Sequence, residues 1–122
     1  MDKKEEKLRM LEDLKKKEEE VEIKKIQLPQ GNQVIGIVEQ RLGGPRVRVK
    51  CFDGKTRIGR IPGRLKRKIW IKEGDYVLCQ PLELQADEKC DIIFKYSPIQ
   101  VKHLREKGII KEVEDEFFED EF

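Results

Sequence analysis

Apolar and polar positions follow two different patterns along the chain. From Val34 onward, five short runs rich in β-branched and aromatic residues alternate with a period of two, which is typical of strands. These runs read VIGIVEQRL, RVRVKCF, TRIGRIP, DYVLCQPLEL and CDIIFKY. Gly or Pro lies between most of them, so each run is predicted to be a separate strand.

The second run predicts a strand with one apolar face and one basic face. Its apolar members are Val47, Val49 and Cys51, and its basic members are Arg46, Arg48 and Lys50. Successive side chains on a strand point to opposite sides, so the two sets are separated. The third run breaks the alternation, because Ile58 and Ile61 flank Gly59 at unequal spacing. We therefore expect a bulge or a sharp coil at Gly59.

The order of the runs predicts a small closed barrel. Short turns join the first three runs, at residues 43–45 and at Asp53-Gly54. The longer stretch RIPGRLKRKIWIKEGD separates the third run from the fourth. Closure removes the unpaired edges that so small a sheet would otherwise expose. We expect an all-β protein, a five-stranded OB-fold barrel.

Both ends of the chain extend beyond this barrel. The segment SPIQVKHLREKG predicts a helix over about 98–107, with Ser97 as N-cap and Pro98 at the first helical position. Residues 1–25 contain good helix formers and a narrow stripe of Leu8, Leu11 and Leu14. A helix and a solvated, fraying arm both remain open there, because an isolated helix gains little stability without packing. We divide the chain into a charged arm (1–25), an OB-fold domain (26–108) and an acidic tail (109–122).

Charge is distributed unevenly along the chain. Charged residues make up 43% of the sequence. Residues 1–25 hold nine basic and nine acidic side chains, residues 26–110 hold seventeen and nine, and residues 111–122 hold one and seven. Between Arg41 and Lys72, twelve basic residues face the single acid Asp53. Such a density of positive charge attracts polyanions.

The residues needed for catalysis or for a metal site are scarce. The cysteines, Cys51, Cys79 and Cys90, have neither a disulfide pattern nor the paired spacing of a zinc site. Ser97 and His103 are the only serine and histidine, and six positions apart they do not share a helix face. Phosphate-binding glycine motifs are absent. We expect no enzymatic activity, no metal and no cofactor. Without a long apolar run or a signal peptide, the protein is expected to be cytoplasmic.

The basic residues predict binding of a nucleic acid. Arg64, Lys66, Arg67 and Lys68 lie in the long connection, and Arg46, Arg48, Arg57 and Arg60 lie on neighbouring strands. Together they are expected to form one continuous surface for phosphates. Only Phe52 and Trp70 are available there for base stacking. This balance favours a folded RNA, recognised by its shape and phosphates, over a flexible single strand.

Several motifs in this region resemble one known family. They are RVRV at 46–49, Asp53-Gly54, RIPGR at 60–64, KRKIWI at 66–71, Gly74-Asp75, and KCDII at 89–93 before Tyr96. This set resembles translation initiation factor 1A, the archaeal and eukaryotic relative of bacterial initiation factor 1, and the archaeal form most closely. The resemblance covers about Ile26 to Gly108.

The resemblance implies an S1-like OB-fold that occupies the aminoacyl (decoding) site of the small ribosomal subunit during initiation. Such factors promote binding of initiator tRNA and messenger RNA, aid subunit dissociation, and work with initiation factors 1, 2 and 5B. Residues 63–68 correspond to the loop inserted at the decoding helix. The implied RNA-facing residues on the strands are Arg41, Arg46, Arg48, Lys50, Arg57 and Arg60, and Trp70 is added to the interface.

The tail and the arm leave alternatives open. The tail EVEDEFFEDEF interleaves Phe117, Phe118 and Phe122 with acids. We hypothesise that it docks on factor 5B, or that it lies back on the basic face as a shield. The protein is expected to be a monomer when free. Other functions to be weighed are a general single-strand binder or RNA chaperone, and a structural protein that oligomerises through its N-terminal helix.

Overall fold

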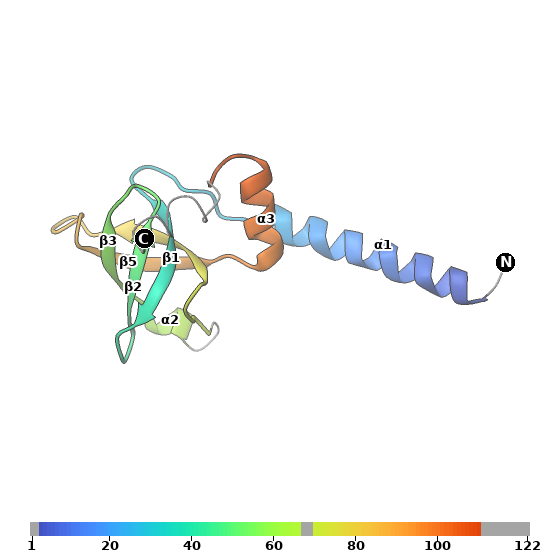
Figure 1. The fold of residues 1–122 in the computed structure, drawn as a ribbon, viewed down its shortest axis with the longest axis horizontal. Helices are drawn as coiled ribbons and strands as arrows, with labels where there is room; N and C mark the ends of the chain where they lie inside the picture. Colours follow the sequence, from blue (N-terminus) through green and yellow to red (C-terminus); the bar gives the residue numbers. More distant parts are fainter. Residues whose placement is uncertain (1–2, 67–69, 111–122) are drawn as a thin grey trace, which may run out of the picture.

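The protein folds as a small barrel with one helix against it and one projecting away (Figure 1). The structure is a computed structural model that describes residues 3–66 and 70–110, the side chain of Lys66 excepted. The strands are β1 (Val34–Arg41), β2 (Arg46–Cys51), β3 (Thr56–Arg60), β4 (Tyr76–Pro81) and β5 (Lys89–Lys95), and the helices are α1 (Lys3–Lys24), α2 (Gly63–Lys66) and α3 (Pro98–Glu106). The prediction of a five-stranded barrel followed by a short helix is confirmed.

The five strands close in the order β1-β2-β3-β5-β4. All neighbours are antiparallel except β3 and β5, which run parallel and complete the ring. The bulge expected at Gly59 is wrong, because the β2–β3 ladder is regular from Arg46↔Arg60 to Lys50↔Thr56. Register shifts occur instead between Val38 and Gln40 and at the start of the β4–β5 pairing.

Gly59 itself occupies the inward position on β3. A Cβ there would lie 2.8 Å from Ile92 Cδ1 and 3.3 Å from Val49 Cγ2. The strand therefore keeps its alternation by placing a glycine inside and Ile58 outside. Gly36 on β1 is tighter still, since its Cβ would lie 2.5 Å from Val49 Cγ1 and 3.0 Å from the Lys50 carbonyl oxygen. Both glycines let the small barrel close around larger neighbours.

The apolar residues form two cores. The first fills the barrel and consists of Val38, Val47, Val49, Cys51, Ile61, Ile71, Val77, Cys79, Cys90 and Ile92. The second lies where α3 and the chain after it pack on β1 and β4, and consists of Ile35, Ile37, Tyr76, Leu78, Tyr96, Val101, Leu104 and Ile110. Because β1 and β4 contribute to both cores, their central residues are buried on both sides of the sheet.

A hydrogen-bonded junction joins α1 to α3. Ser97 and Gln100 form a capping box at the start of α3. The Ser97 hydroxyl also donates to Glu22 Oε2 at 3.2 Å, and Gln100 Nε2 donates to the Glu22 carbonyl at 2.9 Å. The Tyr96 hydroxyl donates to the Gln27 carbonyl oxygen. These contacts attach the C-terminal end of α1 to the barrel.

The N-terminal segment forms a helix rather than a fraying arm. None of the residues of α1 is buried, and Leu8, Leu11 and Leu14 are each more than half exposed. At 1.5 Å per residue the helix extends about 33 Å, and it points away from the barrel in Figure 1. The acidic residues of the predicted tail lie outside the described residues, which end at Ile110.

Candidate nucleic-acid interface

The outer wall of the barrel is covered on one side only. Helix α3 packs on β1 and β4, whereas none of the described helices lies over the outward side chains of β2 and β3 (Figure 1). We call the outward residues of β2, β3 and β5 the bare face; they are Arg46, Arg48, Lys50, Ile58, Arg60, Lys89 and Asp91. The predicted basic side of β2 is thus confirmed as an outward one.

Strand register concentrates charge on the bare face. Arg46 and Arg60 are cross-strand partners in the β2–β3 ladder, and both are exposed. Like charges directly opposite destabilise a sheet, so the arrangement needs anionic neighbours. Asp91 provides one within the protein, with its Oδ1 3.6 Å from Arg60 Nε. Water screens this pair, because the Arg60 side chain is 69% exposed.

The same strands form a shallow groove of about 360 Å³. Arg46, Arg60 and Lys89 supply its cations, and Ile58 and Leu82 supply apolar surface. Beside it, the partly buried Arg48 donates through Nη1 to Gln40 Oε1 at 2.8 Å. Lys89 was absent from the predicted site, although it begins the KCDII motif at the edge of the bare face.

Arg57 does not belong to the exposed surface, which corrects its predicted role. Its side chain is 3% exposed and faces the barrel side of β3, opposite Val49 in the register. It donates to both Asp53 carboxylate oxygens, at 3.1 and 2.8 Å, and to the Ala86 carbonyl oxygen at 2.6 Å. Arg57 therefore links the β2–β3 turn to the β4–β5 loop, and its guanidinium is not turned to the solvent where RNA would bind.

The alternation of the sequence contained this information. Arg57, Gly59 and Ile61 are spaced by two, so an inward Ile61 requires an inward Arg57. Burial by itself would raise the pKa of Asp53, but the hydrogen bonds from Arg57 and from the Lys55 N–H prevail and lower the pKa of this carboxyl. The hydrogen bond to Asp53 in turn raises the pKa of Arg57. The pair is a structural one.

Trp70 and Arg41 form a second exposed feature next to the barrel. The Trp70 side chain is 70% exposed, and the Arg41 guanidinium carbon lies 4.9 Å from the centre of its ring. This distance is that of a cation–π contact. Phe52 is instead half-buried and stacks with Tyr76 at a centroid distance of 6.2 Å. Trp70 is therefore the better placed of the two predicted stacking residues.

The long connection begins with a single helical turn. Helix α2 covers residues 63–66, and the side chain of Arg64 is exposed. The side chain of Lys66 and all of Arg67 and Lys68 fall outside the described residues, so their place in the interface stays a prediction. In Figure 1, α2 lies at the same end of the barrel as the β1–β2 turn.

The described residues contain no group of three or more His, Cys, Asp or Glu side chains arranged to hold a metal ion. All three cysteines are buried. Contacts with the Cys51 and Cys90 thiols, together with burial, raise the pKa of Cys79 and keep it protonated. Over residues 3–66 and 70–110, none of the helices has the length and apolar character to cross a membrane.

A closed five-stranded barrel with a polycationic bare face belongs to the nucleic-acid-binding barrels of the OB type. The family model described as "Translation initiation factor 1A / IF-1" matches residues 18–121. This chain belongs to that family of translation initiation factors. The match begins within α1, so most of that helix lies outside it.

Archaeal relatives agree with this assignment. Translation initiation factor 1A from Methanococcus aeolicus is 56% identical over 86 residues, which cover 70% of this chain and 82% of the relative. The protein of the same name from Sulfurisphaera tokodaii is 46% identical over 96 residues, 79% of this chain and 88% of the relative. The solution structure of the bacterial-type initiation factor 1 from the wolbachia endosymbiont strain TRS of Brugia malayi aligns with a TM-score of 0.44 at 27% identity, covering 60% of this chain and 86% of that chain.

Proposed function

We propose that this protein binds the aminoacyl site of the small ribosomal subunit during initiation and there stabilises the binding of initiator tRNA and messenger RNA. The family assignment supports a role in initiation, and the bare face supplies the chemistry for ribosomal RNA. The observation that carries the proposal is the register of β2 and β3, which leaves several cations outward with few carboxylates beside them. Phosphates would relieve the repulsion among them.

The proposed RNA-binding residues are the exposed or partly exposed members of the predicted set. They are Arg41, Arg46, Arg48, Lys50, Arg60, Arg64 and Trp70, with Lys66, Arg67 and Lys68 from the long connection. Lys89 is added because it lines the same groove as Arg46 and Arg60. Arg57 is excluded, since its guanidinium is committed to Asp53 and Ala86.

Binding to isolated small subunits at several salt concentrations tests the proposal. The Arg46→Ala/Arg48→Ala/Arg60→Ala variant should bind more weakly and should lose about two to three units of the slope of log K against log salt. A matched control, Lys24→Ala/Lys102→Ala/Lys107→Ala, removes three exposed charges near the α1–α3 junction. It should leave both quantities close to those of the native protein.

Two results would contradict the proposal. Equal losses in the test variant and the control would mean that only net charge matters. Equally tight binding of the native protein to an unstructured oligonucleotide would favour the general single-strand binder or RNA chaperone. A Lys66→Ala/Arg67→Ala/Lys68→Ala variant in the same assay separates the contribution of the long connection from that of the bare face.

We also propose that initiation factors 1, 2 and 5B act together with this protein, and that the tail with Phe117, Phe118 and Phe122 contacts factor 5B. The tail combines seven acids with three aromatic residues, a composition typical of segments that order on binding. Deleting residues 112–122 should weaken binding to factor 5B. Tighter nonspecific RNA binding, with factor 5B binding unchanged, would instead assign the tail a shielding role.

A further inference from the structure

Lys95, the last residue of β5, is a basic residue that faces the protein rather than the solvent. Its Nζ donates to the main-chain carbonyl oxygen of Trp70 at 2.7 Å and lies 3.3 Å from Asp75 Oδ2. The Lys95 and Asp75 side chains are only 26% and 13% exposed. The ammonium is thus already neutralised and hydrogen-bonded within the fold, unlike the strongly exposed Arg60 on the bare face.

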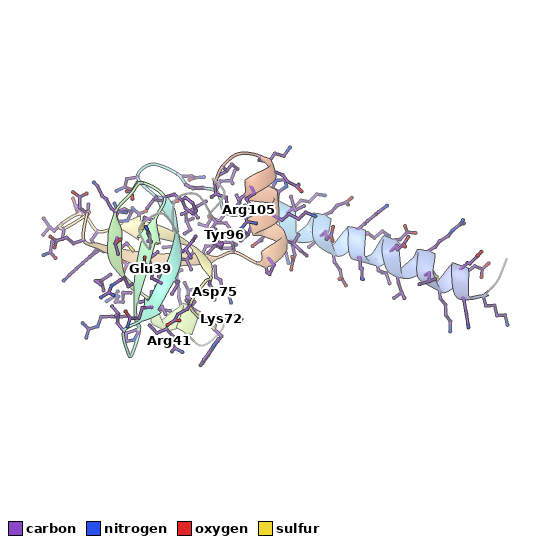
Figure 2. The ribbon with its side chains drawn as sticks, viewed as in Figure 1. Glu39, Arg41, Lys72, Asp75, Tyr96 and Arg105 are labelled. Carbon is purple, nitrogen blue, oxygen red and sulfur yellow. The ribbon has the colours of Figure 1, made fainter. Side chains whose placement is uncertain are left out.

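Asp75 is held in place from two further sides. Its Oδ2 accepts from the Lys72 N–H at 2.8 Å, and its carbonyl oxygen accepts from the Val38 N–H of β1 at 2.9 Å. The Gly74 N–H donates back to the Val38 carbonyl at 2.8 Å. The end of the long connection is therefore fixed to β1, as Figure 2 shows for Lys72 and Asp75 beside the barrel.

Trp70 lies directly before this fixed segment. The next residue, Ile71, is 4% exposed and belongs to the barrel core, whereas the Trp70 indole is 70% exposed. The carbonyl group between them accepts from Lys95. A buried neighbour and a fixed carbonyl limit the rotation of the Trp70 main chain, so its indole remains outward beneath the Arg41 guanidinium.

We propose that Lys95 is a positioning residue of the RNA interface. Its ammonium fixes the Trp70 main chain and, through it, the exposed Trp70–Arg41 pair, so that the pair is ordered before RNA binds. Ordering in advance removes part of the entropic cost of immobilising exposed side chains on binding. This role rests on the proposed function for its effect on affinity, but its effect on Trp70 can be measured in the free protein.

Trp70 is the only tryptophan, so its fluorescence reports the position without a label. Lys95→Met keeps an aliphatic stem but removes the ammonium. We expect greater collisional quenching of Trp70 by acrylamide and lower fluorescence anisotropy, with unchanged circular dichroism. Lys95→Arg keeps a donor cation and should restore part of the native signal. Lys102→Met, at an exposed position on α3, is the matched control and should change neither signal.

Binding to small subunits gives the second measurement. Lys95→Met should weaken binding about two- to tenfold, the range expected for the lost ordering of one or two side chains. The salt slope should be unchanged, because the ammonium neutralises Asp75 rather than a phosphate. A slope reduced by about 0.7 to 0.9, with native Trp70 fluorescence, would overturn the proposal and make Lys95 a direct phosphate contact.

A second variant guards against misfolding of the first. Asp75→Asn keeps an oxygen to accept from the Lys72 N–H but removes the negative partner of Lys95. It should increase Trp70 quenching in the same direction as Lys95→Met, and the double variant should show less than the sum of the two effects. Native quenching in both folded variants would overturn the proposal. If the native protein failed to bind small subunits, the proposed function would fall while the fluorescence result still decided the role of Lys95.

Discussion

The two sides of the barrel wall use the same strand geometry for opposite ends. On the β1–β4 side, outward positions carry Ile35, Ile37, Tyr76 and Leu78, and α3 covers them. On the β2–β3 side, the outward positions carry arginines and a lysine, and none of the helices within residues 3–66 and 70–110 lies over them. One side therefore contributes to stability, and the other exposes charge at some cost to stability.

This difference shows what a closed barrel adds to a strand pattern. Every strand turns one row of side chains inward, so the interior alone satisfies the fold. The outer rows are then free to diverge, and their composition decides which side gains a helix and which side stays open. Substitutions on the two sides should accordingly affect different measured quantities.

The largest effect is expected from the covered side. Leu104 is 0% exposed in the second core, so Leu104→Ala should lower the free energy of unfolding by about 3 kcal/mol. Ile58→Ala on the bare face, where the side chain is only half-buried, should cost about 1 kcal/mol. Urea denaturation of both variants measures the difference. Similar losses would mean that the two sides contribute equally to stability.

A smaller effect separates two arginines of β3. Arg57→Met leaves Asp53 without its ion pair and the Ala86 carbonyl without its donor, and should lower the free energy of unfolding by about 2 kcal/mol. Arg60→Met removes only an exposed pair and should cost less than about 0.5 kcal/mol. In the small-subunit assay the order should reverse, with Arg60→Met the more damaging. Equal stability losses for the two variants would contradict the buried role of Arg57.

The smallest effect concerns pH. The folded protein lowers the pKa of Asp53, so this group stabilises the fold above its unfolded pKa of about 3.9. That contribution is lost as the pH falls through the lower, folded value. Asp53→Asn should therefore lose less stability than the native protein between pH 5 and strongly acidic pH, while being less stable at neutral pH. Parallel pH dependences for the two proteins would rule out Asp53 as a contributor to acid sensitivity.

Much of this architecture could be predicted from the sequence. The period of two located all five strands to within a few residues, because alternation is a local property of extended chains. Ser97 and Pro98 located the start of α3 for a similar reason, since a capping box involves neighbours only. The excess of basic residues between Arg41 and Lys72 needed no structure at all.

The errors came from positions whose role depends on a distant partner. The bulge predicted at Gly59 assumed that Ile58 must be inside, whereas Ile92 on the neighbouring strand takes that space. Arg57 was assigned to RNA because it is basic, although Asp53 and Ala86 bind it inside the protein. Neither neighbour could be chosen before the strand register was known.

The sequence by itself determined the strands, the position of α3 and the polycationic character, because each depends on residues that are near in the chain. Only the tertiary structure decided which outer side α3 covers, which arginines remain outward, and that Lys95 binds the carbonyl of Trp70, 25 residues away. Closure of the barrel sets these choices, since it brings β3 beside β5 and the end of the long connection against β1. Composition therefore supplied the charge, and the packing of distant segments determined where it could act.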